Sequence, residues 1–476
     1  MGPTTQRRGL ARGLRRGLLG AVAAAFALVP LSSAAGASGA RARPLGVTWM
    51  RGFAAPGTPA KFDRVGVIKV GPSSARNVLV LEPGTSAGSA YFVPLAQWIV
   101  SKTKGWQVWS VERRENLLED QSELNLFKEH QATAAQLYDY YLGYLKDPSI
   151  THHIASVATS SVEFAKQWGM NVAVQDLRRV IESAHQLGGK VVLGGHSLGG
   201  SVVTAYATWD FGGHAGADDL AGLVYIDGGS GTTAISATDA TAALAALDVP
   251  SQTPWLAFGG IPAPYAGIFS STGSAAALLD PNGPSLGQAS GLLPADIVPA
   301  TPVTNLGQYG YALNASTSPL SLLAAQGHLG TGLTASGGWN GAGALTPIKR
   351  FATMFSGYPM QGVDGSEWYF PQRLTDDTAA VDNGNANPAQ SVLDVDATMG
   401  HNLPRNLRIY AFGARLGGEE VLQVAQLLAA QSHIPAKNLT LVNRQSTYSH
   451  NDPAGAYPVN AFFAHLVPFL KGIARG

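Results

Sequence analysis

Two stretches of this 476-residue chain, residues 62–230 and 405–476, alternate short apolar runs with longer segments that are apolar at helical spacing. Such alternation predicts a mostly parallel central sheet that helices cover on both faces. Strands are predicted at residues 62–70, 77–81, 107–111, 190–193, 223–226, 407–412 and 439–442. Helices are predicted at residues 89–101, 171–187, 201–209, 419–430 and 459–473. The fold class is therefore α/β.

The alternation stops between the two stretches, over residues 231–404. This region is rich in Gly, Ala, Ser, Thr and Pro. Residues 228–348 hold no Lys, Arg or Glu, and their only acids are Asp239, Asp248, Asp280 and Asp296. We therefore predict one large insertion, a cap or lid, between two late strands. The predicted core is then split into residues 41–230 and 405–476.

Composition excludes several classes of protein. The chain has no cysteine, which excludes disulfides, thiolate metal sites and a cysteine nucleophile. Hydrophobic residues make up 45% of the chain and charged residues only 13%, so a large core is expected and general disorder is not. Lys and Arg total 32 against 31 Asp and Glu, a balance that gives no sign of a nucleic-acid partner.

The first 40 residues predict a secretory signal peptide. Five arginines precede an apolar run at residues 18–31, and small residues with Ala-x-Ala-like spacing follow, with cleavage expected within residues 37–42. The run is too short to span a bilayer comfortably, so no integral membrane segment is expected after cleavage. Removing five arginines from a formal charge of +1 leaves −4. We expect a mildly acidic protein that is secreted or held at the cell envelope, and the Arg7-Arg8 pair is compatible with twin-arginine export.

Three sequences of the form G-x-S-x-G occur, around Ser86, Ser197 and Ser285. A serine nucleophile of this kind needs a sharp turn between a buried strand and a helix, with glycines that let backbones approach closely. Ser197 meets that need, because KVVLGG precedes it and small residues open a helix behind it. Ser86 competes, since it also lies between a strand and a helix. Ser285 does not, because Pro284 and a loop stand where the strand should be.

Together these features resemble the α/β-hydrolase family, specifically its serine esterases and lipases. The resemblance covers roughly residues 62–230 and 405–476. It rests on the strand order, on the GHSLGG turn around Ser197 and on a late histidine. A serine nucleophile is not the aspartate of the dehalogenase and epoxide-hydrolase branches of the fold, so acyl transfer to water is the implied reaction.

The family's triad runs serine, then acid, then histidine along the chain. His450 comes eight residues after the last predicted strand and before the final helix, so the resemblance implies that it is the general base. Two positions compete for the acid. Asp227 directly follows the LVYI strand, whereas Glu419 follows the next strand, where most members of the family carry their acid. Either Glu419 or Glu420 could equally be an acid that the N-terminus of a helix favours.

The resemblance also implies an oxyanion hole with two backbone N–H donors. One is expected from Leu198, the residue after the nucleophile. The other is expected from the loop after the NVLVL strand, at Thr85 or Ser86, where Gly84 and Gly88 would permit close approach.

The sequence contains no convincing metal motif, phosphate-binding loop or dinucleotide fingerprint, so no cofactor and no metal are expected.

The nearly uncharged insertion is the main indication of a substrate. Its aromatic residues could line a pocket for an apolar acyl group or an aromatic group, or the insertion could be a plain lid. The leading hypothesis is an exported hydrolase of carboxylic esters that forms an acyl-enzyme. The alternatives are an acyltransferase or amidase with the same three residues, or an inactive hydrolase fold that serves as a surface binding protein. The aromatic residues in question are Trp255, Phe258, Tyr265, Phe269, Tyr309 and Tyr311.

Overall fold

The structure is a computed structural model, and it describes residues 45–475. The signal peptide expected at residues 1–40 lies outside the described residues. Within residues 45–475, no helix combines the length and the apolar character needed to cross a membrane.

The central element is an eight-stranded sheet with the order β1-β2-β4-β3-β5-β6-β9-β10. β2 runs antiparallel to both β1 and β4, and every other neighbouring pair is parallel. The predicted mostly parallel sheet is therefore confirmed. The strands are β1 (Val47–Arg51), β2 (Arg64–Val70), β3 (Asn77–Glu82), β4 (Trp106–Glu112), β5 (Val191–His196), β6 (Gly222–Ile226), β9 (Arg408–Gly413) and β10 (Leu439–Asn443).

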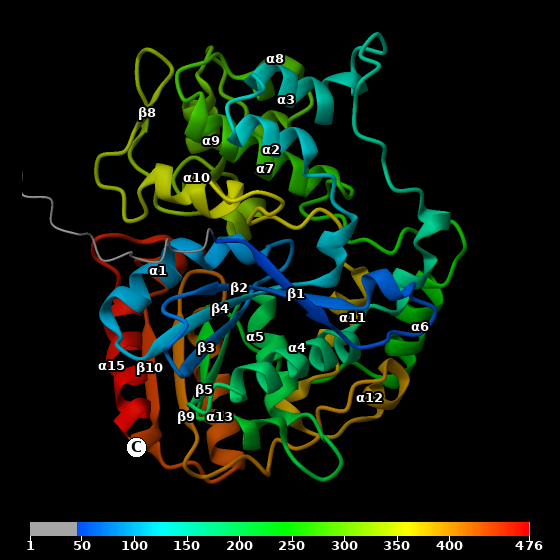
Figure 1. Cartoon of the computed structure of the whole chain (residues 1–476), viewed down its shortest axis with the longest axis vertical. Coiled ribbons are helices and arrows are strands. Elements are labelled where there is room, and N and C mark those ends of the chain that lie inside the picture. The colour runs from blue at the N-terminus through cyan, green and yellow to red at the C-terminus, as the bar shows by residue number, and fades with distance from the viewer. Residues whose placement is uncertain (1–44, 476) are drawn as a thin grey trace, which may run out of the picture. The chain divides into compact units, whose positions relative to one another are not determined.

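Helices cover both faces of this sheet, as the alternation predicted (Figure 1). Side chains of a strand point alternately to the two faces, so Val78 and Val80 join one apolar cluster while Leu79 and Leu81 join the other. Helices α4 (Met170–His185), α5 (Leu198–Thr208) and α13 (Gly418–Gln431) cover the first face. Helices α1 (Val93–Lys102) and α15 (Ala461–Arg475) cover the second.

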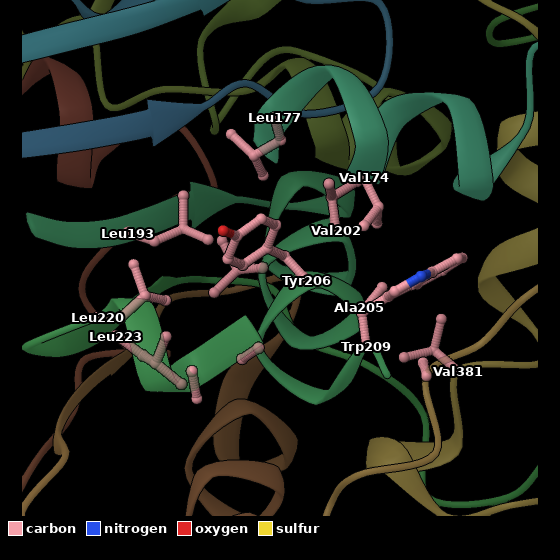
Figure 2. Close-up of a cluster of buried hydrophobic side chains, with 14 of the residues drawn as sticks. Val174, Leu177, Leu193, Val202, Ala205, Tyr206, Trp209, Leu220, Leu223 and Val381 are labelled. Atoms are coloured by element: carbon pink, nitrogen blue, oxygen red, sulfur yellow. The ribbon is translucent and has the colours of Figure 1, made fainter. Parts of the chain in front are cut away.

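The first of these clusters fixes the position of α5. Figure 2 shows Leu193 of β5 and Leu223 of β6 on the same side as Val202 and Tyr206 of α5. Tyr206 is fully buried there. Burial of this much apolar surface holds the first turn of α5 rigidly against the end of β5, which is where the expected nucleophile lies.

The inserted region does not form one group of elements. Its helix α11 (Gln372–Thr378) lies beside α4 and α5, and α6 (Ala237–Leu247) contacts both α11 and α12 (Pro388–Leu393). A second group lies beyond the carboxyl ends of the strands, and we call it the helical cap (Figure 1). It contains α7 (Tyr265–Leu279), α8 (Leu286–Ser290), α9 (Asn305–Leu313), the two-stranded β7 (Gly332–Leu333) and β8 (Trp339–Asn340), and α10 (Ile348–Ser356).

Two helices from before α4 also belong to the helical cap, which the sequence ranges did not predict. They are α2 (Ser122–Lys128) and α3 (Ala134–Tyr141), and both contact α7. Tyr141 of α3 meets Trp368 edge to face at a centroid distance of 5.4 Å. The physical reason is that α3 buries Leu137, Tyr140 and Tyr141, an apolar face that needs a partner.

Candidate functional site

Ser197 lies on a strained turn between β5 and α5. Its backbone has φ 56° and ψ −128°, a conformation that residues with a side chain rarely adopt. The flanking glycines allow it. A Cβ added to Gly195 would lie 2.2 Å from the carbonyl oxygen of Gly199, and one added to Gly200 would lie 2.3 Å from that of Gly228. This is the turn that the sequence around Ser197 predicted.

The two other G-x-S-x-G serines are placed differently. Ser86 lies in the loop after β3, also with a positive φ of 54°. Ser285 is the N-cap of α8, and its hydroxyl accepts the N–H of Gln288 at 3.0 Å. Neither serine lies at a strand-to-helix turn like that of Ser197.

His450 and Asp227 are brought together although 223 residues separate them. Nδ1 of His450 lies 2.6 Å from Oδ2 of Asp227, and both side chains are buried. Asp227 directly follows β6, while His450 lies in the loop after β10, so both stand at the carboxyl edge of the sheet with Ser197. A carboxylate can only accept, so Nδ1 of His450 carries a proton, and in the neutral ring the lone pair is then on Nε2.

Backbone N–H groups hold the Asp227 carboxylate from the other side. Ala414 and Gly417 donate to Oδ1 at 2.6 and 3.0 Å, and Leu416 donates to Oδ2 at 3.2 Å. Burial raises the pKa of Asp227, but the hydrogen bond and charge of His450 together with the Ala414 N–H outweigh it, so the pKa lies below its ordinary value. Asp227 is therefore ionised at neutral pH.

His196, the residue before Ser197, fixes the backbone of His450. Its Nε2 donates to the carbonyl oxygen of His450 at 2.8 Å, and the two rings are 4.3 Å apart between centroids. Burial, and then the neighbouring His450, lower the pKa of His196 to about 3. The His196 ring is therefore neutral and acts as a donor on one side only.

The alternative acid Glu419 is not near His450. It lies in the first turn of α13, is exposed, and accepts the side-chain amide of Asn443 at 2.6 Å. Glu420 shares that first turn. Of the two positions that the sequence offered for the acid, only Asp227 contacts His450.

Asp452 is a buried anchor of the loop that carries His450. Its carboxylate accepts the N–H of Ser449 at 2.7 Å, the N–H of His328 at 3.0 Å and the hydroxyl of Thr346 at 2.7 Å. The ring of His328 also bonds to it. Since His328 and Thr346 belong to the inserted region, that region helps to hold the loop of His450.

A cavity of about 380 Å³ lies between the carboxyl edge of the sheet and the helical cap. Ser197 and His450 are both in its wall, as are Thr85 and Ser86. The remaining wall comes largely from apolar side chains of the helical cap, and among the described residues that line it none is Asp, Glu, Lys or Arg.

Of the six aromatic residues expected there, Phe258, Phe269 and Tyr309 line this cavity. Trp255 instead packs with Trp168 and Tyr369, and Tyr265 bonds to Tyr144.

The loop after β3 passes directly over Ser197. A Cβ added to Gly84 would lie 2.8 Å from the Cβ of Ser197, so only glycine permits this approach. No hydrogen-bond acceptor within residues 45–475 is found for the N–H of Thr85 or of Ser86. Leu198 is the first residue of α5, where N–H groups have no intrahelical acceptor.

Arg113, which follows β4, lies buried behind this loop. Its Nη1 donates to Oε1 of Glu82 at 2.8 Å, and its Nη2 donates to the carbonyl oxygen of Gly84 at 2.8 Å. Glu115 and Glu367 also pair with the same guanidinium. Burial raises the pKa of Glu115 well above its ordinary value, with the neighbouring Glu367 adding to the effect.

Because carboxyl groups near this loop are buried, we expect the free energy of unfolding to be larger in mild acid than in mild base. Burial raises the pKa of Glu82 and that of Glu112 from 4.5 to about 7. A group whose pKa is higher in the folded chain binds more protons there, so the free energy of unfolding falls as the pH rises from 4.5 through about 7. The loss is on the order of 3 kcal/mol for each carboxyl. Thermal unfolding should show a higher Tm at pH 5 than at pH 8.

Glu112→Gln removes one of these titrating groups and should flatten that pH dependence. Exposed Glu420→Gln is the matched control and should leave the slope unchanged. Parallel slopes for all three proteins would contradict the raised pKa of Glu112.

No group of three or more His, Asp or Glu side chains that could hold a metal ion is found in the described part of the chain.

The sequence did not predict the roles of Arg113 and Glu367 or the anchoring role of Asp452. A charged residue directly after a buried strand was a usable signal for Arg113. Glu367 lies in the inserted region and gave no such signal.

No protein-family model and no curated protein matches the chain. Among solved structures, it is similar to a candidate lipase from Sulfolobus solfataricus, at 12% identity and a TM-score of 0.44, over 90% of this chain and 93% of that one. A thermostable carboxyl esterase from Bacillus coagulans gives 11% identity and 0.39, over 91% and 100%. A soluble variant of monoglyceride lipase from Saccharomyces cerevisiae gives 9% and 0.39, over 91% and 96%.

Seven of the eight strands run in one direction, and only β2 runs opposite to them. A strained turn at Ser197 joins β5 to α5. By strand order and by this turn, the chain has the α/β-hydrolase fold.

Proposed function

We propose that the protein is a serine hydrolase that cleaves carboxylic esters through an acyl-enzyme. The observation that carries the proposal is the buried hydrogen bond between His450 and Asp227, with His450 in the wall of the same cavity as Ser197. A strained serine, a histidine with a free Nε2 and an ionised acid behind it are the parts that this chemistry requires.

In the proposed mechanism, His450 takes the proton of Ser197 as the hydroxyl attacks the ester carbonyl. The negative charge that forms on the carbonyl oxygen is stabilised by backbone N–H groups of Leu198 and of Thr85 or Ser86. His450 then gives the proton to the leaving alcohol, and water repeats the sequence on the acyl-enzyme. Asp227 holds the His450 ring and stabilises its charged form.

The cavity supports an uncharged substrate with an apolar acyl or aromatic part. Its wall holds no charged side chain among the described residues, so a charged substrate group would lose its hydration without gaining a partner. Its volume of about 380 Å³ is within the range of small-molecule sites.

The test of the reaction uses purified protein without its first 40 residues. It should react with a fluorophosphonate probe and release p-nitrophenol from neutral acyl esters. Product analysis with an added alcohol or amine separates hydrolysis from acyl transfer, and an anilide series separates esterase from amidase activity. A folded sample that neither labels nor turns over any of these substrates would favour a binding protein instead.

Filling the cavity should change the preferred acyl length. Gly273 of α7 lines the cavity, and a Cβ added there meets only Tyr309, at an ordinary 3.8 Å. Gly273→Leu is expected to raise KM for long-chain p-nitrophenyl esters by about tenfold, since each excluded methylene loses about 0.8 kcal/mol of burial. Acetate and butyrate esters should be affected little.

Gly273→Ala is the matched control, because alanine adds one methyl group and favours the helix. It should keep the wild-type chain-length profile. Equal losses for short and long esters in Gly273→Leu would place the acyl group elsewhere.

A further inference from the structure

Arg113 is connected to the loop over Ser197 by three main-chain hydrogen bonds. The guanidinium donates to the carbonyl oxygens of Pro83 at 3.0 Å, Gly84 at 2.8 Å and Ala87 at 3.0 Å. Its side chain is buried, and it is not among the residues that line the cavity. Arg113 therefore contacts the loop from the side opposite Ser197.

This placement determines where the next N–H group points. In a planar trans peptide, the C=O and the N–H point in opposite directions. The carbonyl of Gly84 points to Arg113, so the N–H of the same peptide, which belongs to Thr85, points away from Arg113. Thr85 and Gly84 both line the cavity, and the N–H of Thr85 has no acceptor within residues 45–475.

The inserted region fixes the same loop from a second side. The N–H of Glu367 donates to the carbonyl oxygen of Ser86 at 3.0 Å, and the N–H of Gly88 donates to that of Gly365 at 3.0 Å. The Glu367 carboxylate also pairs with Arg113. Arg113 thus joins the core strands β3 and β4 to the inserted region through one rigid, planar group.

We propose that Arg113 is a positioning residue that aims the Thr85 N–H at the oxyanion, and that Thr85 rather than Ser86 supplies the second donor. This inference rests on the proposed function. A guanidinium suits the role because its N–H groups are fixed in one plane and can hold carbonyl and carboxylate oxygens together, whereas a lysine ammonium cannot hold that geometry.

The test compares Arg113→Lys with Thr85→Pro, which removes the donor itself because proline has no N–H. Thr85→Ala keeps the N–H, so it measures what the loss of the Thr85 side chain alone does to kcat. Loss of one oxyanion donor costs about 10²- to 10³-fold in kcat, so we expect Thr85→Pro to lose that much and Arg113→Lys to lose about 10- to 100-fold. KM should stay within about threefold in both.

The double variant decides whether the two residues act together. In the Thr85→Pro background, Arg113→Lys should lower kcat by less than about twofold, because the donor that it aims is already gone.

The ratio of rates on an ester and on its thionoester is a second readout, and it does not depend on the stability of the variant. Wild type should prefer an ester over its thionoester, whose sulfur accepts hydrogen bonds poorly, and Arg113→Lys should reduce that preference.

Three results would overturn the inference. They are an unchanged kcat in Arg113→Lys, a full and additive loss in the double variant, and an ester-to-thionoester preference that Arg113→Lys leaves intact. A wild type without Ser197-dependent turnover would instead remove the proposed function, and the role of Arg113 with it. An active wild type with any of the three results would remove the role of Arg113 alone.

Discussion

Replacing Ser197 with alanine is expected to lower kcat for p-nitrophenyl esters by about 10⁶-fold and to abolish labelling by a fluorophosphonate. The hydroxyl that forms the acyl-enzyme is then gone, while the glycines that shape the turn remain. Alanine at a positive φ is no more strained than serine, so Tm should change little. Assays with the probe and with esters of several chain lengths measure the loss of labelling and the loss of kcat on one preparation.

Ser285→Ala is the matched control for this result. Ser285 also stands in a G-x-S-x-G sequence and also lines the cavity, but its hydroxyl caps α8. Its loss should cost about 1 kcal/mol of stability and leave labelling intact. Labelling that survives Ser197→Ala would assign the nucleophile to another residue, with Ser86 the first to examine.

Much of the fold could be predicted because its signals are local. The apolar runs at β3, β5, β6, β9 and β10 each stand out against polar neighbours, and parallel strands place their carboxyl ends at one edge. That rule brings residues after separate strands together without any knowledge of the contacts between them. Ser197 could be singled out from the strand, turn and helix around it, while the family's order of serine, acid and histidine implied His450 and left Asp227 and Glu419 both open for the acid.

What the sequence did not indicate depends on contacts between distant segments. Arg113 and Glu367 are 254 residues apart, and nothing in either local sequence points to the other. β1 was missed because a five-residue edge strand beside a Pro- and Gly-rich segment has a weak pattern. The helices α2 and α3 were assigned to the core because their partner, α7, is far away in the sequence.

Asp452 illustrates the same limit at short range. Its position before a proline is typical of a turn or a helix start, and α14 (Asp452–Gly455) does begin there. The carboxylate nevertheless faces the inserted region, where His328 and Thr346 donate to it. Sequence identifies the local role of such a residue, and only the packing shows that it also ties the loop of His450 to the inserted region.

Asp227→Asn is expected to lower kcat by about 10⁴-fold by forcing the wrong tautomer on His450. The asparagine oxygen can take the place of Oδ1, which accepts three backbone N–H groups, from Ala414, Gly417 and Gly418. The amide NH₂ then replaces Oδ2 and faces Nδ1 of His450. Nδ1 must become the acceptor, its proton moves to Nε2, and Nε2 can no longer take the proton of Ser197.

The same substitution also sets the amide NH₂ against the N–H of Leu416, so Tm should fall as well. Glu419→Gln separates the two candidate acids, since Glu419 is exposed and bonds to Asn443. It should keep kcat within about twofold, as surface substitutions usually have small effects. A large loss of kcat in Glu419→Gln, together with an active Asp227→Asn protein, would show that the buried pair of Asp227 and His450 holds the structure together without taking part in the reaction.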